Sequence, residues 1–117
     1  MKILFILNDP PYGTERFYNA RRLAHALAKA EPGIEITMFL MADAVSGGHK
    51  NQKVPQGYYT VERMLKQVVA SGGEVLLCGT CMDARGLADA DLMDGARRGT
   101  MAELAAATLA ANKMLVF

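Results

Sequence analysis

The sequence predicts an α/β fold with a mostly parallel sheet, because apolar runs of strand length alternate with helical patterns along its 117 residues. Three of these runs, Lys2–Leu7, Ile34–Met41 and Glu74–Cys78, are apolar or β-branched almost throughout. Such strands are buried on both faces, as in parallel sheets that helices cover. The segments between them carry apolar residues at three- and four-residue spacing, which is typical of helices packed on a sheet.

The first half of the chain contains one predicted helix and one predicted loop. The helix runs from Thr14 to about Ala30, and Pro32-Gly33 ends it. Its apolar stripe consists of Phe17, Ala20, Leu23, Ala24 and Leu27. The segment Ser46–Pro55 is polar, contains glycine and has no period, so we expect a loop there.

The second half repeats the alternation. A helix is predicted from Gly57 to about Ser71, with Gly72-Gly73 as its end. Thr80 and Asp83 form a capping-box pattern that opens a short helix over Cys81–Gly86. Leu87–Gly99 has no clean period. A second capping box, Thr100 with Glu103, opens an alanine-rich helix to about Ala111, and Lys113–Phe117 is the last predicted strand.

Composition limits the class of protein. The chain is 51% hydrophobic and 21% charged, which fits a packed single domain over residues 1–117. Its net charge of +1 favours neither a nucleic-acid partner nor a membrane surface. The apolar runs are far shorter than the ~20 residues that cross a bilayer, and the first is too short for a signal peptide. We therefore expect a cytoplasmic protein.

Both cysteines lie in the segment Cys78-Gly79-Thr80-Cys81, where an apolar strand gives way to a helix. The unpaired N–H groups and positive dipole end of a helix stabilise a thiolate, which is the reactive form of cysteine. Cys81 is expected to feel this effect directly, whereas Cys78, at the strand end, is expected to be more buried. This segment is the strongest chemical signal in the sequence.

Four interpretations of Cys78 and Cys81 are open on the residues alone. A thiolate could attack an S–S bond and carry the extra sulfur as a persulfide. The pair could be a dithiol–disulfide couple. It could supply half of a metal site, but His25 and His49 are distant in sequence, so another subunit would have to complete it. Finally, cysteine is often just a small buried residue. No cofactor or metal motif is present, so none is predicted.

Polar residues follow the carboxyl ends of the predicted strands, where sites form in parallel sheets. The loops that leave these ends are Asn8–Gly13, Asp43–Lys53 and Cys78–Arg85. We expect them to converge on the cysteine pair, with a pocket lined by Asn8, Asp9, Tyr12, Lys53, Asp83 and Arg85.

Several longer segments together carry a family resemblance. They are Asn8-Asp9-Pro10-Pro11-Tyr12-Gly13, Arg22–Leu27, Phe39–Val45, Gln52-Lys53, Gly57-Tyr58, Met64-Leu65, Leu77–Gly86 and Lys113–Phe117. With them the chain resembles the DsrE/DsrF-like sulfur-relay family over its whole length, and the YchN-like branch most closely.

The resemblance implies a three-layer α/β/α domain with a five-stranded sheet, which requires a short strand within Leu92–Arg97. It implies a ring-like homo-oligomer, a trimer or a hexamer, and the 8 methionines and many alanines of the chain fit an apolar subunit contact. Sulfur-transferring members place the accepting cysteine seven residues before an Arg-Gly pair. That position is Cys78 here, before Arg85-Gly86, with Cys81 as a partner thiol.

The leading hypothesis is therefore a carrier that accepts sulfane sulfur on Cys78 from a donor protein and relays it to an acceptor protein. The alternatives are a homo-oligomeric binding or assembly module whose cysteines are incidental, and a dithiol redox switch.

Overall fold

The computed structural model describes residues 1–117 and contains one five-stranded sheet in the order β4-β3-β2-β1-β5, with every neighbouring pair parallel. The strands are β1 (Lys2–Leu7), β2 (Glu35–Leu40), β3 (Glu74–Cys78), β4 (Ala96–Gly99) and β5 (Lys113–Val116). The predicted α/β class and parallel sheet are confirmed.

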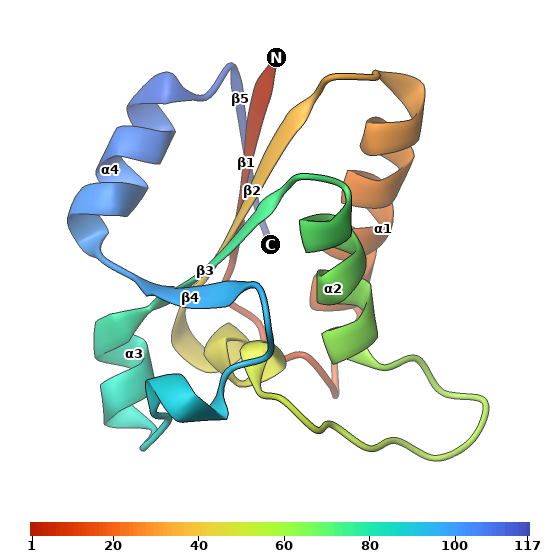
Figure 1. Ribbon diagram of the computed structural model, residues 1–117, viewed down its shortest axis with the longest axis vertical. Coiled ribbons are helices and arrows are strands. Elements are labelled where there is room, and N and C mark those ends of the chain that lie inside the picture. The colour runs from red at the N-terminus through yellow and green to blue at the C-terminus, as the bar shows by residue number, and fades with distance from the viewer.

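Helices cover both faces of this sheet. They are α1 (Arg16–Ala30), α2 (Val61–Ala70), α3 (Gly79–Ala84) and α4 (Met101–Ala110), with two 3-10 segments, η1 (Ala42–Gly48) and η2 (Asp89–Asp91). Figure 1 shows α1 and α2 on one side of the sheet and α4 on the other, while α3 and η1 lie at the carboxyl ends of the strands. This is the three-layer arrangement that the resemblance implies.

The core is built from the apolar strand residues and the inner stripes of the helices. Phe5, Phe39 and Leu77 are fully buried in β1, β2 and β3. Phe17 of α1 and Leu65 of α2 pack into the same cluster. Burial of the strands on both faces explains why these runs lack polar alternation.

Two helices begin later than the sequence pattern predicts. Helix α1 begins at Arg16 and not at Thr14, and α2 begins at Val61 and not near Gly57. Gly13 and Gly57 have φ values of +98° and +90°. A left-handed conformation is incompatible with a right-handed helix, so Gly57, which the pattern placed in the second helix, belongs to the preceding loop.

The predicted loop Ser46–Pro55 is wrong for its first residues, because Ser46, Gly47 and Gly48 belong to η1. Gly47 and Gly48 are buried there. A Cβ on Gly48 would lie 2.6 Å from Leu77 Cδ2, which is closer than non-bonded carbons approach. The missing side chain thus lets η1 pack directly on β3, next to Cys78.

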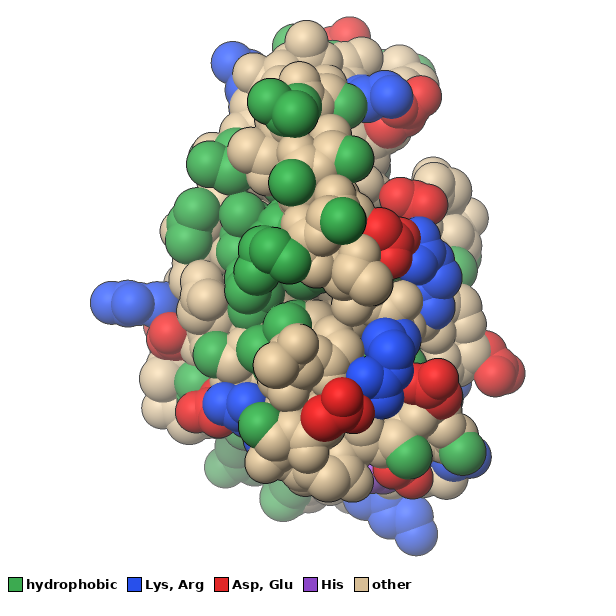
Figure 2. Space-filling view, turned by 90° about the vertical axis from the view of Figure 1, so that its left-hand side faces the viewer, with side chains coloured by type: hydrophobic (Ala, Val, Ile, Leu, Met, Phe, Trp, Pro, Cys, Tyr) green, Lys and Arg blue, Asp and Glu red, His purple; other side chains and the backbone are tan.

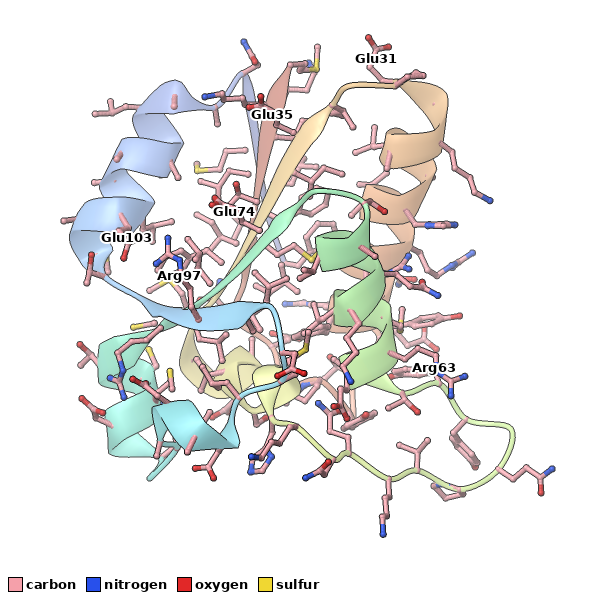
Figure 3. The ribbon with its side chains drawn as sticks, in the orientation of Figure 1. Glu31, Glu35, Arg63, Glu74, Arg97 and Glu103 are labelled. Atoms are coloured by element: carbon pink, nitrogen blue, oxygen red, sulfur yellow. The ribbon has the colours of Figure 1, made fainter.

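The strand that the resemblance implies is present, but it begins near the end of Leu92–Arg97 and extends two residues beyond that range. Strand β4 covers Ala96–Gly99 at one edge of the sheet. Because it contains Arg97 and Arg98, its sequence lacks the apolar pattern that predicts a strand. Figure 3 shows Arg97 and Glu103 near each other between β4 and α4, and their side chains form an ion pair of 2.7 Å. Thr100 caps α4 as predicted, since its hydroxyl accepts the Glu103 N–H at 3.1 Å.

The predicted apolar stripe of α1 contains one error. Leu23 is exposed, whereas Arg21, one helical position away from Ala20, is buried. Arg21 donates its Nε–H to the Met64 carbonyl at 2.8 Å and a second N–H to the Gln67 side chain. A long side chain can bury its stem and still satisfy its donors, which the apolar pattern does not reveal.

No helix of the structure combines the length and apolarity that crossing a bilayer requires.

Candidate functional site

Both cysteines lie at the junction between β3 and α3, and both are free thiols. Helix α3 begins at Gly79, with Cys78 as its N-cap, and the Cys78 Sγ accepts the Cys81 N–H at 3.4 Å. The predicted Thr80 capping box is therefore wrong. The Cys78 sulfur occupies the capping position, and Thr80 lies within the first turn.

A second backbone donor reaches the other sulfur. The N–H of Ala42, at the start of η1, donates to Cys81 Sγ at 3.3 Å. Ala42 has a φ of 49°, a left-handed conformation that is uncommon for a residue other than glycine. Strained backbone of this kind clusters at functional sites, and here it lies in direct contact with a thiol.

The two thiols differ in exposure. Cys78 is 8% exposed, whereas Cys81 is half-buried. Burial raises the pKa of the Cys78 thiol, and the adjacent Cys81 side chain raises it further, although the N–H groups of Cys81 and Thr80 act in the opposite direction. The expectation that the helix start lowers the pKa of this thiol is therefore not met at Cys78, because desolvation outweighs the N–H donors.

Arg85 connects α3 to η1. Its Nε and Nη2 donate to Asp43 Oδ1 at 3.0 and 2.9 Å, and its Nη1 donates to the Cys81 carbonyl at 3.1 Å. The guanidinium is thus held against the helix that carries Cys81. The ion pair is solvent-exposed, so we expect it to orient α3 more than to stabilise the fold.

Arg98 of β4 holds the opposite flank of α3, and sequence reasoning did not single it out. Its Nη1 donates to the Gly79 carbonyl and to Asp83 Oδ1, both at 3.0 Å, and its Nε donates to Asp89 at 2.7 Å. A Cβ on Gly79 would lie 2.9 Å from Arg98 Nη1. In the sequence, Arg98 is marked only by its place in the Arg97-Arg98 pair, which follows no helix or strand period. Its contact with Gly79 forms only when the chain folds.

The structure brings some of the predicted pocket residues together and separates others. Asp83 and Arg85 lie on and beside α3, near the cysteines. Asp9 accepts a hydrogen bond from Thr14 at 3.1 Å, and the Asn8 N–H is paired with the carboxyl-terminal strand segment at Phe117.

Tyr12 and Lys53 line a different part of the surface, a hollow that contains neither cysteine. The other three main hollows also lack both cysteines. In the single chain the buried Cys78 and the half-buried Cys81 therefore line none of these hollows, and they share none of them with Tyr12 and Lys53.

Metal ligands do not gather around the thiols. No group of three or more His, Cys, Asp or Glu side chains is arranged to hold a metal ion. His49 directs its Nδ1 at the Lys50 carbonyl, 2.8 Å away, and His25 is exposed on α1. The chemistry available at this junction is that of two neighbouring thiols.

The raised pKa of Cys78 predicts a pH-dependent reactivity. Because only the thiolate reacts with iodoacetamide, alkylation of Cys78 should be slow at neutral pH and accelerate as the pH rises beyond the usual range of a thiol. Peptide mass spectrometry of each cysteine after timed alkylation measures this. Rapid alkylation of Cys78 that does not change between neutral and alkaline pH would contradict it.

Comparisons with known proteins show which sequences and folds this chain is similar to. The chain is 43% identical to Protein YchN of Escherichia coli (strain K12) over 116 residues, which are 99% of this chain and 98% of that protein. It is 36% identical to the uncharacterized protein MJ0989 of Methanocaldococcus jannaschii over 117 residues, which are 100% of both chains.

Solved structures show the same fold. The crystal structure of the E. coli YchN protein matches with a TM-score of 0.95 at 43% identity, over 100% of this chain and 99% of that one. MTH1491 of Methanobacterium thermoautotrophicum, a protein of unknown function, matches with a TM-score of 0.83 at 10% identity, over 99% of this chain and 98% of that one. The model of the DsrE/DsrF-like family matches residues 1–117, so the chain belongs to that family.

Proposed function

We propose that the chain is a cytoplasmic sulfur carrier that accepts sulfane sulfur on Cys78 and relays it to a partner protein. The observation that supports this best is the placement of two free thiols at the carboxyl end of β3, each with a backbone N–H directed at its sulfur. Membership of the DsrE/DsrF-like family supports the same chemistry.

The proposed step is a thiol exchange. Cys78 first loses its proton to solvent, and the N–H groups of Cys81 and Thr80 stabilise the resulting thiolate. The thiolate forms a bond to the outer sulfur of a donor persulfide while the S–S bond of the donor breaks. The donor leaves as a thiolate, and Cys78 is then a persulfide. An acceptor thiolate removes the outer sulfur in the same way, which regenerates Cys78.

The burial of Cys78 requires that the donor reach an 8% exposed sulfur. Cys81 is the more accessible of the two thiols, which suits its role as the partner thiol beside the acceptor. Docking of the donor or a small movement of α3 would be needed to expose Cys78.

Sulfur loading tests the assignment. After incubation with a persulfide donor, intact-mass spectrometry should show one added sulfur on the wild-type chain and none on Cys78→Ser, because serine cannot hold the extra sulfur as a persulfide. Loading should return to zero after treatment with a reducing thiol.

Cys81→Ser is the matched control, since it alters the neighbouring thiol and leaves Cys78 in place. It should still load one sulfur. Equal loading of the wild type and Cys78→Ser, or loss of loading only in Cys81→Ser, would overturn the assignment to Cys78.

A dithiol switch is a second candidate, and the contact between the Cys81 N–H and the Cys78 sulfur favours it by holding the two residues together. Exchange with a small-molecule disulfide would join the two sulfurs in a disulfide, and the oxidant would take up the two electrons and two protons as two thiols. A redox titration followed by thiol labelling should then show a reversible two-electron couple. The absence of such a couple would remove this candidate.

We also propose that the chain forms a homo-oligomer, a trimer or a hexamer, through the face that carries α4 and β5. Figure 2 shows hydrophobic side chains gathered over this face. Leu109 is 88% exposed, and Met101, Met114 and Val116 are exposed beside it. Contiguous apolar surface of this kind marks an interaction site, and a helix that is apolar around most of its circumference is normally buried. If the protein is instead an assembly module whose cysteines have no chemical role, its subunits would meet through this same face.

The oligomer can be tested by light scattering. The wild-type chain should have the mass of a trimer or hexamer, and Leu109→Glu should lower that mass, because it introduces a charge into the proposed contact without changing a buried residue. Arg63→Glu, on the exposed side of α2, should leave the mass unchanged. A wild-type monomer would contradict the proposal.

A further inference from the structure

All 4 tyrosines of the chain gather at one place on the surface, although the sequence separates them by up to 47 positions between Tyr12 and Tyr59. The ring of Tyr59 lies between two others, with its centroid 4.4 Å from that of Tyr18 and 5.8 Å from that of Tyr12. The interplanar angles are 26° and 27°, so the three rings form a stack. Tyr58 lies beside this stack.

Two rings of the stack, those of Tyr12 and Tyr59, form one wall of a hollow of about 570 Å³. Tyr12, Tyr58 and Tyr59 line it together with Thr14, Lys53 and Pro55. Small-molecule sites commonly measure about 300–1,000 Å³ and combine aromatic walls with a few polar groups. The hollow therefore has the size and the lining of a ligand site.

Hydrogen bonds hold the Tyr12 wall in place without any ligand. The Tyr12 hydroxyl donates to Gln52 Oε1 at 2.6 Å and accepts the Val61 N–H at 3.1 Å. The N–H of Gln52 in turn donates to the buried carboxylate of Glu62 at 2.9 Å. A wall that is ordered beforehand lowers the entropy that binding must overcome.

The packing of the loop does not explain why the ring of Tyr58 is exposed. It is 71% exposed, and its hydroxyl has no hydrogen-bond partner in the protein. Stacking that served only to stabilise the loop would cover this ring at least as far as it covers the half-buried ring of Tyr59. An exposed ring beside a ring stack instead leaves an aromatic surface free for a planar ligand.

The charges around the hollow favour a negatively charged ligand. Lys53 forms no ion pair, so its ammonium group is uncompensated. Glu15 lines the same hollow as the N-cap residue of α1, where the positive end of the helix dipole offsets only part of its charge, so the anionic group of a ligand is assigned to the side of Lys53.

The geometry points to a binding site for a planar aromatic ring that carries an anionic group, as in a nucleoside monophosphate, with the ring stacked on the tyrosines and the anion at Lys53. This site is separate from the cysteine pair, because neither Cys78 nor Cys81 lines the hollow. Its occupancy is independent of sulfur loading.

Ligand-observed NMR with adenosine 5′-monophosphate as the probe tests the site. The adenine protons should shift upfield in the presence of the wild-type chain, because they enter the ring-current field of the tyrosines. Adenosine, which lacks the phosphate, should bind more weakly, and ribose 5-phosphate, which lacks the ring, should bind least. Tyr58→Ala should weaken binding of the monophosphate about fivefold or more, as loss of one stacking surface does.

Lys53→Gln should reduce the affinity for the monophosphate to that for adenosine and leave adenosine binding unchanged. Lys50→Gln is the matched control, since Lys50 lies in the same connection and does not line the hollow, and it should bind like the wild type. Cys78→Ser should also bind like the wild type. No upfield shift with the wild type, or wild-type affinity in both Tyr58→Ala and Lys53→Gln, would overturn the inference.

Discussion

Replacing Leu77 by alanine is expected to lower the free energy of unfolding by about 2–5 kcal/mol, the range for removing a fully buried leucine. Leu77 is 0% exposed and precedes Cys78 in β3, and its methyl groups contact Gly48 of η1. The cavity left by the missing atoms would lie between β3 and η1. Because the N–H of Ala42 at the start of η1 contacts Cys81, the change should also loosen the thiol site.

Chemical denaturation measures the first effect, and the alkylation rate of Cys78 under native conditions measures the second. The rate should rise in Leu77→Ala because its surroundings pack less tightly. Leu23→Ala is the matched control, since Leu23 is 39% exposed on α1, and it should change neither quantity appreciably. An unfolding free energy within experimental error of the wild type would show that η1 does not depend on this contact.

Replacing Glu62 by glutamine is expected to cost about 1.5–3 kcal/mol, the range for a hydrogen bond to a charged group. Glu62 is 9% exposed, and its two carboxylate oxygens accept the N–H groups of Asn51 and Gln52 at 3.2 and 2.9 Å. A glutamine side chain has only one acceptor oxygen. The connection that leads from η1 to the tyrosine hollow should therefore lose order.

This carboxylate also predicts a pH dependence. Burial alone would raise the pKa of Glu62, but the N–H groups of Gln52 and Asn51 and the Lys66 ammonium outweigh it and hold the pKa below the usual value. A carboxylate with a depressed pKa in the folded state stabilises the protein at neutral pH, and this contribution is lost as the pH falls through the folded pKa. The stability difference between wild type and Glu62→Gln should shrink accordingly in acid.

Lys66→Ala is the control for the charge alone. This substitution removes only the 3.3 Å ion pair between Lys66 and Glu62. Because the Lys66 side chain is 52% exposed, we expect the free energy of unfolding to fall by less than about 1 kcal/mol. Denaturation curves of the three proteins at neutral and acid pH separate the two contributions. A difference between wild type and Glu62→Gln that stays constant with pH would refute the role assigned to the carboxylate.

Much of the architecture could be predicted because it depends on local patterns. The apolar run Glu74–Cys78 predicts a buried strand, and the structure has a strand with the same bounds. Thr100 predicts the start of α4 through a hydroxyl that reaches an N–H three residues away. Strand β4 could not be predicted from its own residues, because Arg97 and Arg98 occupy an edge where side chains reach solvent and neighbouring carboxylates.

The site was predictable to a smaller extent. The position of Cys78 and Cys81 at a strand-to-helix junction follows from the order of the elements. Their protonation does not, because the pKa of Cys78 depends on how deeply the folded chain buries it and on its contact with the Cys81 side chain. The separation of Tyr12 and Lys53 from the cysteines also could not be predicted, since loops at the same edge of a sheet can lead in different directions.

The sequence by itself determined the α/β class, the order of the elements and the presence of a thiol pair where a parallel strand ends, since each follows from hydrophobic periodicity or from residue type at fixed spacing. Only the tertiary structure decided which thiol is buried, that Arg98 reaches Gly79, and that Tyr12 lines one hollow with Tyr58 and Tyr59, from which it is distant in sequence. Burial, charge compensation and aromatic stacking arise between residues far apart in the chain, and such contacts exist only once the chain has folded.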